Sequence, residues 1–204
     1  MQQMAKGDID RVIEAHHREL FDTLKLVTEK LYRRNPREWR KTGLPSMEAA
    51  VARLFDQEHG WRLHEFEDKR GIEVVQMAFR PEFGGDRVGA LMGGLAGMIQ
   101  TAFRDHAEFF IVDELDPQAL SNAARNVEIA VWKLSQARDE SGAPLLLSNE
   151  ISSDGTVRNL SFEREFGKLI GGLDMSARIV ADKNNRVVTR ILQTLATAVF
   201  LPVK

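Results

Sequence analysis

The sequence predicts a mainly α-helical protein, a single-domain bundle of several helices around a central helix that is rich in glycine. Two long segments carry apolar residues every three or four positions, the pattern of a helix with one buried face. A third segment, residues 88–103, contains no charged residue at all. The 204 residues include 43% hydrophobic and 28% charged ones, a composition typical of folded globular proteins. We expect one domain over residues 1–204, with residues 1–7 flexible.

The first 56 residues are expected to form helices separated by prolines. Apolar residues recur at spacings of three and four over residues 8–34, which predicts a long amphipathic helix. Pro36 ends this helix, because the residue before a proline disfavours the helical conformation. The same proline suits the first turn of a new helix. Ser46 is expected to cap a further helix that runs to about Asp56.

The middle of the chain is expected to continue the bundle. Residues 60–71 are polar and predict a connection, and residues 72–79 favour a short helix. Asp116 and Pro117 supply a cap and a first-turn proline for a second clear amphipathic helix. We expect this helix to end near Gly142, since glycine is the usual residue after a helix.

The last third of the chain carries a hairpin signal and then a helical pattern. Residues 152–155, Ser-Ser-Asp-Gly, form a turn sequence between two segments that favour β-strands, 145–151 and 156–162. A small β-hairpin is therefore expected there. The apolar spacing from Phe162 onward predicts one broken helix or two consecutive helices that end near Pro202.

Four glycines recur at every fourth position in and just before the uncharged segment and are predicted to allow close helix packing: Gly85, Gly89, Gly93 and Gly97. Each interior glycine costs a helix about 1 kcal/mol relative to alanine, so close approach of a neighbouring backbone should offset the loss. The pattern also resembles the glycine zippers of membrane helices. The uncharged run has 16 residues, fewer than the roughly 20 that span a bilayer. We therefore expect a buried helix inside the bundle.

The sequence offers few candidates for catalysis or metal binding. Glu14 and His17 are three positions apart, so on a helix they share a face, as in carboxylate-bridged di-iron proteins. The chain has no second Glu-x-x-His and no cysteine, and we expect no metal and no other cofactor. A helical metalloprotein or enzyme that uses Glu14 and His17 is kept as an alternative function.

A cluster of cationic residues around an aromatic one follows the first helix: Arg33, Arg34, Arg37, Trp39, Arg40 and Lys41. Such a cluster can contact an anionic surface such as phospholipid headgroups. Complementary charge at helix ends, with Glu29 and Glu38 as partners, explains most of it. The formal net charge is −2, so nothing in the overall charge would attract nucleic acid, and we do not expect a nucleic-acid partner.

Several long segments resemble a family of uncharacterised proteobacterial envelope lipoproteins. They are LYRRNPREWRK at 31–41, GGDRVGALMGGLAGMI at 84–99, LDPQALSNAARNVEIAVWKLSQARD at 115–139, and the closing LSFEREFGKLIGG and ILQTLATAVFLPV. The resemblance implies a location on the periplasmic side of the envelope, with a lipid anchor on a cysteine upstream of Met1. It implies no activity and no catalytic residue.

These observations lead to three hypotheses of function. The first is a non-enzymatic, periplasm-facing lipoprotein domain that acts through contacts with an envelope protein or the membrane surface. The second is the metalloprotein or enzyme alternative, and the third is a protein whose glycine-rich helix leaves the bundle and inserts into a membrane. A cytoplasmic location stays open as well. The partner, ligand and oligomeric state are not predicted by the sequence.

Overall fold

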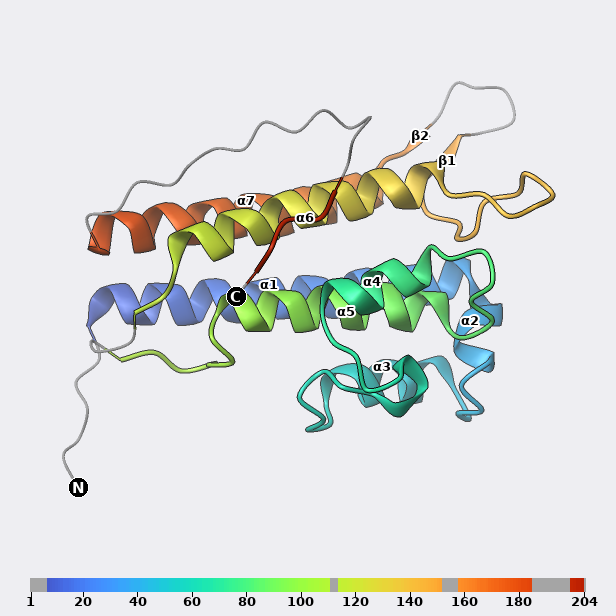
Figure 1. Ribbon diagram of the computed structural model, residues 1–204, viewed down its shortest axis with the longest axis horizontal. Helices are drawn as coiled ribbons and strands as arrows, with labels where there is room; N and C mark the ends of the chain where they lie inside the picture. Colours follow the sequence, from blue (N-terminus) through green and yellow to red (C-terminus); the bar gives the residue numbers. More distant parts are fainter. Residues whose placement is uncertain (1–6, 111–113, 152–157, 185–198, 204) are drawn as a thin grey trace.

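A computed structural model of the chain describes residues 7–110, 114–151, 158–184 and 199–203. Four long helices, α1, α5, α6 and α7, run side by side and form a bundle (Figure 1). Helix α7 packs along both α1 and α6, while α5 packs along the short helix α4 and contacts α1 and α6. The predicted mainly helical bundle with a central glycine-rich helix is confirmed.

The helices and strands have the following bounds. The helices are α1 (Asp8–Arg34), α2 (Pro36–Arg40), α3 (Met47–Phe55), η1 (His64–Phe66, a 3-10 turn), α4 (Ile72–Ala78), α5 (Arg87–Ala102), α6 (Pro117–Gln136) and α7 (Ser161–Asn184), and the strands are β1 (Glu150–Ile151) and β2 (Arg158–Asn159).

The predicted starts of α3 and α6 are confirmed by the hydrogen bonds at their N-caps. The Ser46 hydroxyl accepts a hydrogen bond from the backbone N–H of Ala49 at 3.1 Å, which caps α3. The Asp116 carboxylate accepts one from Gln118 N–H at 3.0 Å and caps α6, whose first residue is Pro117. These bonds satisfy N–H groups that have no partner inside their own helix.

Helix α6 ends at Gln136, six residues before the predicted end. Ala137 takes an extended backbone conformation, with φ −64° and ψ 129°. Its carbonyl oxygen then accepts a hydrogen bond from Leu145 N–H at 3.1 Å. Inside the loop so formed, the Asp139 carboxylate accepts hydrogen bonds from the N–H groups of Ser141 and Ala143. Glycine at position 142 therefore belongs to this loop and not to the end of α6.

The predicted hairpin is present but much shorter than its strand-favouring segments. Strands β1 and β2 have two residues each and pair antiparallel, Glu150 with Asn159 and Ile151 with Arg158. Leu145 and Leu146 are instead buried under the helices, and Ser161 already begins α7. The turn, residues 152–157, lies outside the described residues.

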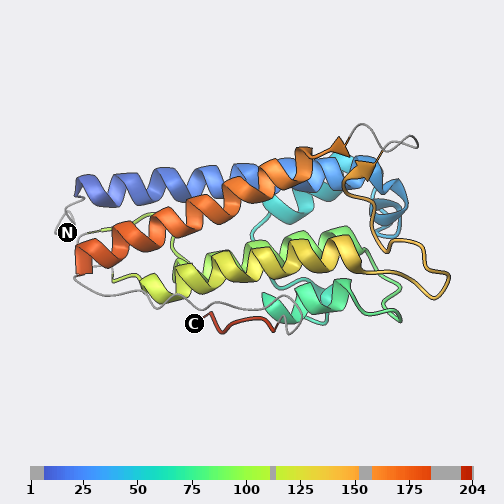
Figure 2. The same ribbon diagram turned by 90° about the horizontal axis from the view of Figure 1, so that it is seen from above.

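Only part of the helical prediction for the end of the chain falls on described residues. Helix α7 ends at Asn184, and residues 185–198 lie outside the described part, as do residues 1–6 at the other end. Residues 199–203 have no helical structure and run along the side of α6 that faces away from α7 (Figure 2). We call them the C-terminal segment.

Helix α5 lies at the centre of the bundle, because α1, α3, α4 and α6 all contact it and nearly all of its residues are buried. Of the four glycines predicted to allow close packing, Gly85 lies outside the helix. The N-cap is Asp86, whose carboxylate accepts a hydrogen bond from Gly89 N–H at 2.9 Å. The prediction that Gly85 serves close helix packing is therefore wrong, since its nearest non-neighbouring atoms belong to the ring of Phe83.

The closest approach between two helices is at Gly94, which is not one of the four glycines predicted to allow close packing. A methyl group added there would lie 2.7 Å from the backbone nitrogen of Val75 and 3.0 Å from the carbonyl oxygen of Gly71. Both neighbouring atoms belong to the backbone at the start of α4 and cannot rotate away. At Gly93 the same methyl would lie 3.4 Å from a methyl group of Leu54, an ordinary packing distance. Close backbone packing between α5 and α4 therefore depends on Gly94.

We predict that Gly94→Ala destabilises the protein by about 1–3 kcal/mol, the usual cost of overpacking a filled core. Gly93→Ala is the matched control, and we expect it to be neutral or to stabilise by up to about 1 kcal/mol, because alanine favours the helix and the methyl finds room. Urea unfolding followed by circular dichroism measures both. Equal free energies of unfolding for the two variants would contradict the assignment.

Candidate functional site

The structure places Glu14 and His17 next to each other on α1, but each is engaged by a different part of the chain. A carboxylate oxygen of Glu14 accepts a hydrogen bond from Phe109 N–H at 2.9 Å. The Nε2 atom of His17 hydrogen-bonds the side-chain oxygen of Gln100 at 3.0 Å. Within the described residues, no group of three or more His, Cys, Asp or Glu side chains could hold a metal ion.

His17 lies in an aromatic environment beneath the surface. Its ring stacks on Phe21 with centroids 4.5 Å apart and meets the edge of Phe103 at 5.0 Å. Burial lowers the pKa of His17, and the hydrogen bond with Gln100 offsets part of that effect. The neutral ring is therefore favoured here, and this histidine serves the packing of α1 against the end of α5.

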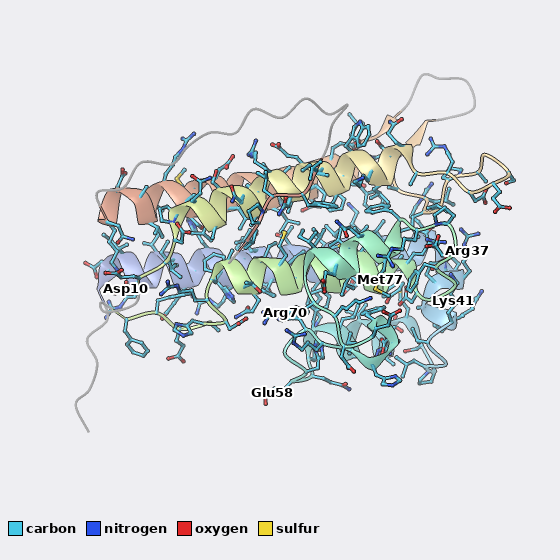
Figure 3. The ribbon with its side chains drawn as sticks, viewed as in Figure 1. Asp10, Arg37, Lys41, Glu58, Arg70 and Met77 are labelled. Carbon is cyan, nitrogen blue, oxygen red and sulfur yellow. The ribbon has the colours of Figure 1, made fainter. Side chains whose placement is uncertain are left out.

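The predicted basic cluster gathers at the end of the bundle near α2, and a buried carboxylate neutralises part of it. Glu38 is 0% exposed. Its two carboxylate oxygens accept hydrogen bonds from Arg37 Nε at 3.1 Å and from Lys41 Nζ at 2.7 Å. The two cations lie close together in Figure 3. Arg37 also donates to the carbonyl oxygen of Leu145 and Lys41 to that of Gly85, so both side chains hold loops in place.

The other cationic members of the cluster differ in their exposure and contacts. Arg33 is exposed and lies 3.4 Å from Glu29, one turn earlier on α1. Arg34 is half-buried, and Arg40 is exposed, with its guanidinium 5.3 Å from the centre of the Trp39 ring. The six residues therefore do not form one uncommitted cationic surface, because Arg37 and Lys41 are held by Glu38.

Buried polar groups at the beginning of α5 are also matched within the protein. The Tyr32 hydroxyl donates to the Asp86 carboxylate at 2.5 Å, and Glu38 accepts a hydrogen bond from Arg87 N–H at 2.8 Å. The guanidinium of Arg87 donates to the carbonyl oxygens of Ala78, Arg80 and Pro81, where α4 ends. Burial raises the pKa of Asp86, while the hydrogen bonds from Gly89 and Tyr32 oppose that rise. These charges stabilise helix ends.

The opposite end of α5 forms one wall of an open groove with a volume of about 590 Å³. The groove lies between the start of α4, the last turns of α5 and the C-terminal segment. Its lining includes apolar side chains and four charged ones: Ile72, Met98, Phe200, Leu201, Pro202 and Val203 on the one hand, and Arg62, Arg70, Glu73 and Asp105 on the other. Arg70, labelled in Figure 3, forms an ion pair with Asp105.

The C-terminal segment is held against α6 by side-chain amides. Asn126 donates to the carbonyl oxygen of Leu201 at 2.8 Å and accepts from Leu201 N–H at 2.6 Å. One turn earlier, Asn122 donates to the carbonyl oxygen of Pro202 at 2.8 Å and accepts from the amide of Gln118 at 2.9 Å. We call Gln118, Asn122 and Asn126 the amide row.

Sequence reasoning did not identify the amide row or the groove. The signal for the row was a set of side-chain amides at intervals of four, which places them on one helix face. Amides on a buried face require hydrogen-bond partners. The sequence could not show that these partners come from a segment about 75 residues later.

No known protein family matches the chain, and no curated protein or solved structure is significantly similar to it. The resemblance to envelope lipoproteins therefore stays a prediction. None of the described helices combines the length and the apolar character that a membrane span requires.

His17 yields a testable pH dependence. Its pKa is lower in the folded state than in the unfolded chain, where the pKa of a histidine is about 6.5. Its stabilising contribution is thus present above that pH and is lost as the pH falls toward the folded pKa. We predict that His17→Gln reduces the loss of stability between pH 7 and pH 5, by at most about 1.4 kcal/mol per pH unit for one proton.

The measurement is urea unfolding at several pH values. His64→Gln changes an exposed histidine in the same way and serves as the control. A His17→Gln variant with the wild-type pH dependence would show that protonation of His17 is not linked to unfolding.

Proposed function

We propose that this chain is a non-catalytic binding domain that acts through protein contacts, and that its partner docks in the groove beside the C-terminal segment. The observation that carries the proposal is the groove itself, about 590 Å³ in volume, with one wall made of an extended peptide segment. Apolar residues at the centre of an interface with charged residues around them are typical of protein-binding surfaces. Ile72, Met98 and Phe200 would supply the former, and Arg62 and Glu73 the latter.

The walls of the groove formed by α4 and α5 are anchored to the core, which supports a pre-formed site on that side. Met98 is buried in the central helix, and Gly71 places the start of α4 against α5. Arg62 donates to the carbonyl oxygen of Asp68 at 2.9 Å, which fixes the connection before α4. A pre-formed surface loses less conformational entropy on binding than a surface that must order first.

We further propose a location on the periplasmic side of a bacterial envelope, tethered by a lipid. This part of the proposal rests on the sequence resemblance described above. A natural gene that encodes a leader and a cysteine upstream of Met1 would support it. A gene whose first codon is Met1 would overturn it, without affecting the proposal of a protein-binding groove.

We predict that a photoreactive benzoylphenylalanine at Glu73 or Thr101, both in the groove, cross-links to a discrete partner in cells of the natural host. The same group at Arg178, an exposed position on α7, is the control and should not yield that product. Gel shifts followed by mass spectrometry identify the products. An identical pattern at all three positions, or no product at the groove positions, would contradict the proposed site.

A further inference from the structure

The amide row presents its side chains along one face of α6, because its members are four residues apart. Asn126 is 0% exposed and Asn122 is 7% exposed. Leaving a buried amide without partners destabilises the fold, so a row of this kind needs a polar ligand. In the folded chain that ligand is the main chain of residues 201 and 202.

Asn126 contacts Leu201 in the manner of a neighbouring β-strand. Its amide pairs with both the N–H and the carbonyl oxygen of this one residue, at 2.6 and 2.8 Å. Both contacts involve main-chain atoms, so any residue except proline could satisfy them. Asn126 therefore selects an extended backbone with an available N–H group.

Asn122 matches the next residue in a complementary way. Proline has no N–H group, and Asn122 contacts Pro202 only by donating to its carbonyl oxygen. The oxygen of Asn122 instead accepts the hydrogen bond from Gln118. The amide row thus pairs with the N–H and carbonyl oxygen of one residue and with the carbonyl oxygen of the next, a position where a proline leaves no donor unsatisfied.

The side chains of the C-terminal segment add few buried contacts. Phe200 and Val203 are half-buried against the core, Val199 is 69% exposed and Pro202 is exposed. None of residues 199–203 is fully buried. Most of the specific recognition is therefore directed at the backbone, which another peptide could present equally well.

A second asparagine in the same protein pairs with both main-chain polar groups of one residue, an arrangement that we call an amide clasp. Asn35 pairs with both the N–H and the carbonyl oxygen of Leu147, at 2.7 and 2.8 Å. There the adjoining Leu145 and Leu146 are buried in the core at 6% and 3% exposure. The C-terminal segment has the same amide clasp without buried side chains of this kind.

We infer that the amide row is a binding site for an extended peptide of a partner protein, which the chain's own C-terminal segment occupies in cis. The partner segment has two apolar residues, then proline, then an apolar residue, as in Phe200-Leu201-Pro202-Val203. This inference rests on the proposed protein-binding function and names the kind of segment bound. Because the segment also forms one wall of the groove, its replacement would change the groove's lining.

The cis ligand competes with any peptide added in solution. A tethered ligand acts at an effective concentration in the millimolar range. A partner peptide should therefore bind the wild-type chain weakly and bind tightly only when the C-terminal segment is released. Leu201→Pro in the chain of residues 1–204 removes the N–H group that donates a hydrogen bond to Asn126, and it should release the segment.

The probe is a fluorescent synthetic peptide with the sequence of residues 197–204, TAVFLPVK, and fluorescence anisotropy measures its binding. We expect binding to the Leu201→Pro chain to be at least tenfold tighter than to the wild type. A peptide with N-methylleucine at the position of Leu201 lacks the same N–H group and should bind the released chain about tenfold more weakly. This comparison uses a single protein variant, so it does not depend on how further variants fold.

Variants in the Leu201→Pro background locate the site. Asn126→Asp keeps the side-chain shape but removes the donor to the carbonyl oxygen, and we expect at least a tenfold loss of peptide affinity. Gln136→Glu makes the same chemical change at an exposed position near the end of α6 and should leave the affinity unchanged. Circular dichroism checks that the variants are folded.

Equal binding of the normal and N-methylated peptides would overturn the inference, and so would a lack of binding to the released chain. A concentration-dependent wild-type dimer that Leu201→Pro abolishes, measured by sedimentation, would also overturn it, because the occupant would then be the segment of a second copy. If the peptide does not bind but the groove positions cross-link to a partner, the inferred peptide site is overturned. The proposed protein-binding function would then still be supported.

Discussion

Burial of α5 on all sides is the constraint on which the rest of the structure depends. A helix without an exposed face needs neighbours on every side, and α1, α3, α4 and α6 provide them. Its first N–H groups are also buried, so the carboxylates of Asp86 and Glu38 accept hydrogen bonds from Gly89 and Arg87. On the side facing α4, the backbones come so close that only glycine fits at position 94.

This constraint explains why the charged residues near the start of α5 stabilise the fold. A carboxylate that is buried to cap α5 needs cations beside it, because an unpaired buried charge is costly. Arg37 and Lys41 fill that need for Glu38, and each also binds a loop carbonyl. The other end of α5 instead meets an open groove, where Arg62 and Glu73 line the solvent side. The candidate binding site is therefore at the end of α5 opposite the basic cluster.

Local sequence signals predicted the helices well, and contacts between distant segments account for what they missed. Periodicity predicted α1, and Ser46 and Asp116 marked the starts of α3 and α6. The glycine spacing located the central helix, yet the close approach is at Gly94, because the position of α4 decides which glycine meets a backbone. The amide row was missed because its ligand is a distant segment, and a side-chain amide in a helix carries no sign of its partner.

The two asparagine clasps use the same interaction, which serves folding at Leu147 and, in our proposal, binding at Leu201. An amide that pairs with both the N–H and the carbonyl oxygen of one residue fixes a segment without reference to its side chains. Whether the attachment is permanent then depends on the apolar side chains beside it. Leu145 and Leu146 bury apolar area worth about 1.5–3 kcal/mol each, which ties the clasp at Leu147 to the stability of the core. The clasp at Leu201 lies between a half-buried Phe200 and an exposed Pro202. In our proposal its segment leaves α6 at a smaller loss of buried apolar area, provided that another peptide satisfies Asn126.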